Sequence, residues 1–188
     1  MTFTRSKARA IWLLALLAAA GVVRAQGLDS HVHGSAELNV VSIGQQLQIE
    51  FFSPAINLLG FETAPNNEEE TAMLNETSTQ LQDDDWLLGD ALPDCQLTTN
   101  TIETPAAEEH IHEQDDDHDH SGHAGDVEAH SNFHVQYLYD CPAAPPDRLL
   151  IVAFDRYKGI ESITVQWIAG QKQGFAKLTP SNPVLTFD

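Results

Sequence analysis

Residues 36–52 read AELNVVSIGQQLQIEFF, and this stretch decides the fold class. Apolar and polar side chains alternate in part over residues 36–41. They alternate again over residues 46–52, where Leu47, Ile49 and Phe51 share one face of an extended chain. Residues 42–45 separate the two runs and include Gly44, which is typical of a turn. The stretch predicts a β-hairpin with one buried face.

Further elements follow along the chain. We expect one helix capped by Asn66 or Asn67, because three glutamates at residues 68–70 suit a helix N-terminus. Its buried stripe would comprise Met73, Leu74, Thr77 and Leu81. We expect strands at residues 133–139, 148–154, 162–168, 174–178 and 183–187. The predicted fold is α+β and rich in antiparallel β-structure.

Two segments of the chain echo each other weakly. LQIEF at residues 47–51 precedes GFE at 60–62, and LLIVAF at 149–154 precedes GIE at 159–161. A histidine pair stands upstream of each segment. Two interpretations stay open: an internally duplicated β-domain, or chance resemblance between short strands.

The first 25 residues have the parts of a secretory signal peptide. A basic start with Arg5, Lys7 and Arg9 precedes an apolar run at residues 10–23, and Val23-Arg24-Ala25 ends it like a cleavage site. The run is shorter than the roughly 20 residues that a spanning helix needs. We therefore expect export with cleavage after Ala25 and no stable membrane insertion; an N-terminal anchor is the alternative.

The chain is strongly acidic. It has 28 Asp and Glu against nine Lys and Arg, a formal charge of −19. The signal peptide holds four of the bases and no acid, so its removal leaves −23, and no base lies between residues 26 and 147. Such a field repels nucleic acid and anionic lipid and attracts cations. The alternative is that the charge only keeps an exported protein soluble.

Residues 98–129 differ from their surroundings in having few apolar side chains and no periodicity. We predict a disordered His/Asp-rich insert between a β-rich subdomain with one helix at residues 26–97 and a second β-rich subdomain at 130–188. Its histidines lie among carboxylates: His110, His112, His118, His120 and His123. Imidazole suits zinc, copper, nickel and iron, so several weak metal sites are predicted; a solvated acidic loop is the alternative.

A histidine pair at His31 and His33 is the sharper motif. Side chains two apart share a face of an extended chain, so both imidazoles could bind one ion. Zinc takes about four ligands, and Asp29, Glu62 or a second histidine pair could supply the rest. Two unrelated surface histidines are the alternative.

The second pair is His130 and His134. Side chains four apart lie on one side of either a helix or a strand, so this pair is also a candidate metal site, with solvated histidines as the alternative. The two cysteines, Cys95 and Cys141, predict one disulfide in an exported chain. It would stabilise the fold by roughly 4 kcal/mol on the chain-entropy model. Metal ligation by the cysteines is the alternative.

Nothing in the sequence has the pattern of a hydrolase nucleophile, a zinc-protease helix or a phosphate-binding loop, so we expect no enzymatic activity. A zinc-dependent enzyme with an open coordination position is the less favoured alternative. A periplasmic copper- or nickel-binding protein, or a metallochaperone, is the other.

HVHGSAELNV at residues 31–40 and SPAINLLGFE at 53–62 resemble the ZrgA-like family of zinc-regulated periplasmic proteins of Gram-negative bacteria. The resemblance continues through Cys95, the insert, Cys141 and TVQW at 164–167. It implies binding of Zn²⁺ in the periplasm in support of an ABC importer, without catalysis. The partner would be that importer or another periplasmic zinc-binding protein. By position, the family's H-x-H pair falls on His31 and His33 and its variable insert on residues 110–123.

Overall fold

The computed structural model describes residues 32–105 and 132–188. Within these ranges the chain is mostly β, with a large mixed sheet and few helices, as an α+β prediction requires. The elements are β1 (Ser35–Ile43), β2 (Gln46–Pro54), α1 (Ala55–Leu59), α2 (Glu68–Gln80), α3 (Asp85–Leu88), β3 (Gln96–Glu103), β4 (Asn132–Asp140), β5 (Arg148–Leu150), α4 (Ala153–Arg156), β6 (Ser162–Ala169), β7 (Lys172–Leu178) and β8 (Val184–Thr186).

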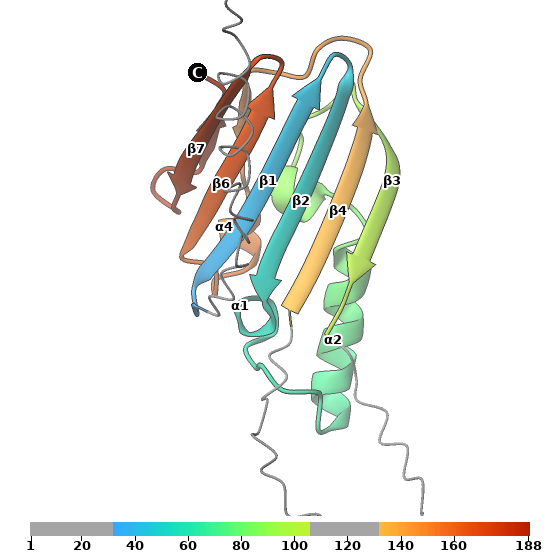
Figure 1. Ribbon diagram of the computed structural model, residues 1–188. Coiled ribbons are helices and arrows are strands. Elements are labelled where there is room, and N and C mark those ends of the chain that lie inside the picture. The colour runs from blue at the N-terminus through green and yellow to red at the C-terminus, as the bar shows by residue number, and fades with distance from the viewer. Residues whose placement is uncertain (1–31, 106–131) are drawn as a thin grey trace, which may run out of the picture. The chain divides into compact units, whose positions relative to one another are not determined.

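The large sheet has the strand order β3-β4-β2-β1-β6-β7 (Figure 1). Its neighbours are antiparallel except β1 and β6, which run parallel. The predicted hairpin lies at the centre, where β1 and β2 pair around Gly44, whose φ of 63° suits glycine. Strands β5 and β8 form a second, smaller sheet. Strands from both sides of residues 106–131 therefore share the large sheet.

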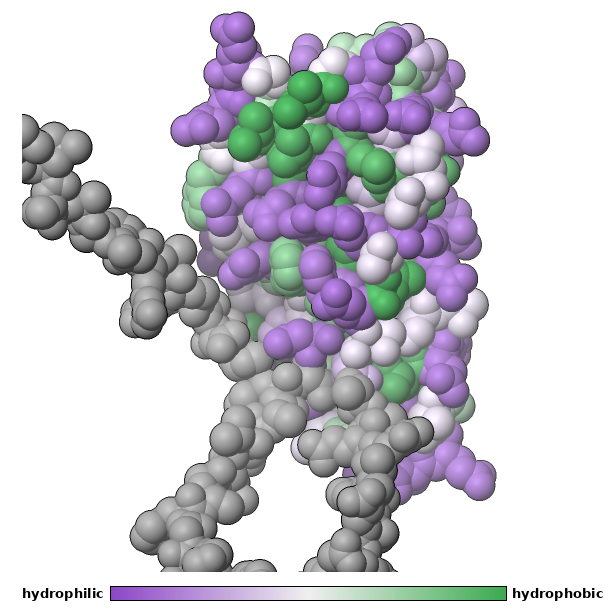
Figure 2. All heavy atoms as spheres, turned by 45° about the vertical axis from the view of Figure 1, so that its right-hand side comes forward, coloured by the Kyte–Doolittle hydropathy of each residue, from purple (hydrophilic) through white to green (hydrophobic). Residues whose placement is uncertain are grey.

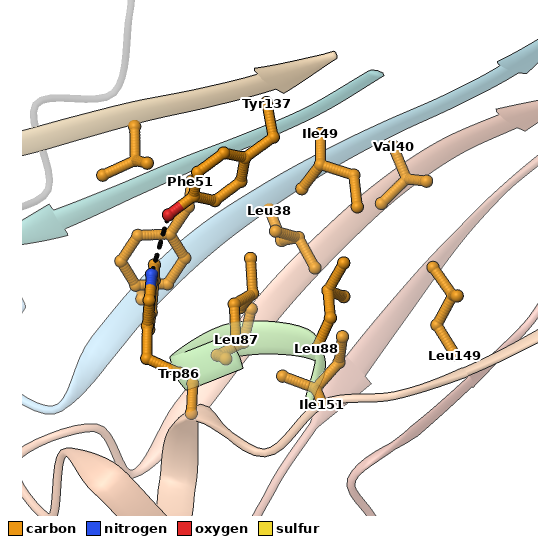
Figure 3. Packing of buried hydrophobic residues seen from close by; sticks show 14 of the residues in the cluster. Leu38, Val40, Ile49, Phe51, Trp86, Leu87, Leu88, Tyr137, Leu149 and Ile151 are labelled. Atoms are coloured by element: carbon orange, nitrogen blue, oxygen red, sulfur yellow. Dashed lines mark hydrogen bonds between the residues drawn. The ribbon is translucent and has the colours of Figure 1, made fainter. Parts of the chain in front are cut away.

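The core lies on one face of the large sheet, which the helices cover (Figure 1). Alternate residues of the central strands point into it, as the hairpin pattern predicted. Helix α3 contributes Leu87 and Leu88, which point toward the sheet near Leu38 (Figure 3). Fully burying such side chains stabilises the fold by roughly 1.5–3 kcal/mol each.

A buried tyrosine ties the helices to the sheet. The hydroxyl of Tyr137 in β4 accepts a hydrogen bond from Trp86 Nε1 at 2.8 Å (Figure 3). The same hydroxyl lies 2.5 Å from the carbonyl oxygen of Leu81 and 2.9 Å from that of Asp83. Burial raises the pKa of Tyr137, so the hydroxyl stays a neutral donor. This one group connects β4 to α3 and to the end of α2.

The predicted disulfide between Cys95 and Cys141 is present. Strands β3 and β4 between the cysteines pair from Gln96 opposite Asp140 to Glu103 opposite His134. The disulfide therefore closes one end of this strand pair, and residues 106–131 join its other end.

The predicted N-terminus of the helix is confirmed. The side chain of Asn67 accepts from Glu70 N at 2.8 Å, and Asn66 N donates to the Glu70 carboxylate at 2.9 Å. Of the expected stripe, Leu74, Thr77 and Leu81 are buried. The prediction that Met73 is buried is wrong, because this residue faces solvent and is 38% exposed.

Two predicted boundaries are also wrong. Residues 98–103 belong to β3 and not to the insert: the strand is polar because it is a sheet edge and mostly exposed. The strand expected at residues 148–154 ends at Leu150, and Ala153–Arg156 is the helix α4. A short run that is apolar throughout carries no period that separates strand from helix.

The two similar sequence segments do not occupy equivalent positions in the fold. Residues 47–51 lie in the central strand β2, whereas residues 149–154 divide between β5 and α4. An internal duplication is therefore not confirmed.

Hydrophilic side chains cover most of the surface in Figure 2, with hydrophobic ones gathered mainly toward its upper end. The exposed large apolar residues of the large sheet are Ile43, Ile168 and Phe175. In the described ranges, no helix has the length and apolar character that crossing a membrane requires.

Replacing Tyr137 by Phe should lower the free energy of unfolding by about 1–3 kcal/mol, because it leaves the buried Trp86 N–H without its acceptor. Tyr157→Phe is the matched control, since the Tyr157 hydroxyl is less buried and its contact with Gln80 is long, at 3.4 Å. Urea unfolding of both variants measures the difference. Equal losses would show that the Tyr137 hydrogen bonds add nothing.

Candidate metal centre

His33 lies at the corner of a tight turn that leads into β1. Ser35 N donates to the carbonyl oxygen of Val32 at 2.9 Å, and Gly34 has a φ of 81°. A positive φ at the third position of a four-residue turn is typical of type II and favours glycine there. The turn leaves 61% of the His33 side chain exposed, so an ion can reach it from solvent.

The buried side chain of Asn57 holds this turn in place. Its Oδ1 accepts from Gly34 N at 2.8 Å, and its Nδ2 donates to the Ser35 carbonyl oxygen at 2.9 Å and to Ser53 Oγ at 3.1 Å. Asn57 lies in α1, which follows β2 directly, and is only 4% exposed. The sequence gives one sign of this role: a polar residue inside the apolar run AINLL.

Glu62 is the partner of His33. Helix α1 ends at Gly60, which has a left-handed φ of 84°, and the chain then brings Glu62 back to the turn. His33 Nε2 and Glu62 Oε1 are 2.5 Å apart, and the Glu62 side chain is 28% exposed. Imidazole nitrogen and carboxylate oxygen are both zinc ligands, so the pair that holds a proton here can hold a metal ion instead. Glu62 was among the expected ligands.

The pair is not a complete metal site. Across residues 32–105 and 132–188, no three His, Cys, Asp or Glu side chains lie together as a metal ion requires. His31 lies outside the described residues. The prediction that His31 and His33 share one face assumed an extended chain, whereas His33 lies in a turn.

His134 is in a different environment from His33. Its ring stacks on Phe52 of the neighbouring strand, with centroids 4.1 Å apart. Its Nδ1 is 3.3 Å from Glu103 Oε2, and its Nε2 is buried without a hydrogen-bond partner. In this conformation Nε2 cannot meet an ion from solvent, whereas Nδ1 faces the exposed carboxylate of Glu103.

The last residues of β3 and the first residues of β4 lie at the same end of the sheet as His33. Strand β3 ends at Glu103 and β4 begins at Asn132, opposite Pro54 at the end of β2 (Figure 1). Strand β1 begins at that end too, right after the His33 turn. The other candidate ligands lie outside the described residues: Asp29, His110, His112, His118, His120, His123 and His130.

Ion pairing at this end of the sheet involves histidine and not lysine or arginine. In the part of the chain that the structure describes, the ion pairs are His33 with Glu62, His134 with Glu103, and Lys158 with Asp155. Among the described residues, the carboxylate of Glu62 therefore has no lysine or arginine partner, which leaves it available to a cation.

Comparison with known protein families gives a match over most of the chain. A family model described as ZrgA family zinc uptake protein matches residues 30–187. No curated protein matches the chain. The matched range includes the turn, α1 and Glu62.

Replacing Asn57 by Ala should lower the free energy of unfolding by about 1–3 kcal/mol, because Gly34 N and the Ser35 carbonyl lose a buried partner. Asn75→Ala on the exposed side of α2 is the control and should change it little. Chemical denaturation in the presence of a chelator measures both. A loss no larger in Asn57→Ala than in the control would remove Asn57 as the anchor of the turn.

Proposed function

Because the chain belongs to the ZrgA family of zinc uptake proteins, we propose that it captures zinc in the periplasm and assists its delivery to an ABC importer. The observation that carries this proposal is the contact between His33 and Glu62 at an exposed turn. The role is binding and transfer of an ion, and it involves no catalysed reaction.

The chemistry of the pair suits zinc. One imidazole and one carboxylate supply two of about four ligands, and both are groups that zinc accepts. His31 is two residues from His33 and is the proposed third ligand. Copper and nickel also bind such groups, so the donor set alone favours no single ion, and the family supports zinc.

Residues 106–131 have a second role in the proposal. Their histidines and carboxylates would gather zinc weakly, since a segment that must be ordered on binding gives up affinity. The segment joins the sheet at the end that carries His33 and Glu62. Ions collected by the segment would then be released close to the tighter site.

Export and partners belong to the same proposal. Residues 1–25 would direct the chain to the periplasm and be cleaved after Ala25. The partner would be the importer or a second periplasmic zinc-binding protein, and the acidic charge of the chain argues against nucleic acid.

The tight site should depend on His33 and not on His134. A chain with residues 106–128 replaced by a short Gly-Ser linker isolates it, and the linker suits the antiparallel neighbours β3 and β4. In this background His33→Ala or Glu62→Gln should weaken zinc binding at least about tenfold by calorimetry. His134→Ala is the matched control and should leave the affinity unchanged. If His134→Ala instead removes the site, the second histidine pair holds the ion.

Zinc should be released as the pH falls. Only neutral imidazole binds a metal, and histidine titrates near about pH 6.5, so protons and zinc compete for the same nitrogen. Carboxylates stay ionised down to about pH 4–5 and cannot cause a loss above that range. Zinc titrations at several pH values between about 5 and 8 should show affinity falling below about pH 6.5. Binding that is flat over this range would mean that imidazole is not a ligand.

A further inference from the structure

Glu161 reaches the His33 turn from the C-terminal half of the chain. It directly precedes β6, the strand that runs parallel to β1. The carbonyl oxygen of Gly34 accepts two hydrogen bonds, from Glu161 N at 2.7 Å and from Ser162 N at 2.9 Å. The backbone of Glu161 is therefore fixed to the residue next to His33.

The side chain of Glu161 also lies against Gly34. A Cβ atom on Gly34 would stand 2.9 Å from Glu161 Cδ, closer than real Cβ atoms come, and 3.1 Å from its Oε2, which is a tight contact. The positive φ favours glycine at this position, and a side chain there would require the Glu161 carboxylate to shift. The carboxylate of Glu161 occupies the space that such a side chain would take.

Glu62 and Glu161 each follow a segment that contains or contacts Asn57. Glu62 follows α1, which contains Asn57. The loop before Glu161 contains Gly159, where a Cβ atom would come within 2.4 Å of the Asn57 carbonyl oxygen. The loop before Glu161 therefore packs on the backbone of Asn57, and the two glutamates come from opposite halves of the chain. They are also the glutamates that end the two echoing segments GFE and GIE.

The charges at this turn are unbalanced. Glu161 is exposed, and among the described residues it forms no ion pair. Glu62 pairs only with His33. Two carboxylates near this turn favour a divalent cation, because the ion neutralises both.

We propose that Glu161 is a further protein ligand, beside His31, of the zinc held by His33 and Glu62, an inference that rests on the proposed function. In the structure the three side chains do not yet converge on one point. The Glu161 side chain is exposed and reaches the ion by a change of rotamer, while its backbone stays bound to Gly34. The resulting site has one nitrogen and two oxygen ligands from the described residues, which zinc accepts.

The test uses the full mature chain labelled with ¹⁵N, titrated with zinc in the presence of a competing chelator. The amide signals of Gly34 and Ser162 report on this site alone, even while other histidines bind zinc. Glu161→Gln keeps the size of the side chain and removes its charge. It should weaken the zinc response of these two signals at least about tenfold. Asp155→Asn is the matched control, an exposed acid on α4, and should leave the response unchanged.

His33→Ala separates the two claims. If His33→Ala abolishes the response and Glu161→Gln leaves it within about threefold of the wild type, Glu161 is not a ligand and the proposed function stands. If the signals of Gly34 and Ser162 do not respond to zinc, or respond equally in His33→Ala, the site itself is wrong. An amide spectrum of Glu161→Gln that matches the wild type without zinc shows that the fold is intact.

Discussion

The side chain of Asn57 makes the contacts on which the geometry of the His33 turn, the candidate metal centre, depends. Its amide accepts a hydrogen bond from Gly34 N and donates to the Ser35 carbonyl oxygen and to Ser53 Oγ. Asn57 itself is almost fully buried. Through it, the turn that carries His33 is attached to the helix that leads to Glu62. A buried amide is costly unless it is fully bonded, so this arrangement has few alternatives of similar energy. The position of His33 is therefore defined by the core, although its ring is exposed.

Electrostatics explain why a rigid, exposed turn suits the capture of an ion. The chain has a formal charge of −19, and its nine Lys and Arg leave the region from residue 26 to residue 147 without a base. Surface ion pairs contribute only about 0–1 kcal/mol, so the His33 and Glu62 contact does little for stability and can be exchanged for a metal contact at small cost. Stability comes instead from the sheet, the buried Tyr137 network and the disulfide.

The elements that the sequence predicts well are those whose signals are local. The hairpin alternates over residues 36–52, and the helix at Glu68 begins with its own capping residues. Contacts between distant residues give no such signal: Gly34 meets Glu161 only because β1 and β6 are parallel neighbours. The spacing of His134 from His130 predicts a metal ligand, yet in the structure its ring stacks on the neighbouring Phe52. Glu62 could be named as a candidate by its chemistry, but its contact with His33 depends on the turn and on α1.

The central claim is that zinc is held at the end of the sheet by His33 and Glu62. Elemental analysis tests it most directly, on protein purified from the periplasm under zinc limitation without a histidine-affinity step. Wild type should carry zinc in preference to copper and nickel, and the double variant His33→Ala with Glu62→Gln should carry less zinc per chain at equal protein yield. Equal zinc in the two proteins, or another metal in the wild type, would contradict the account.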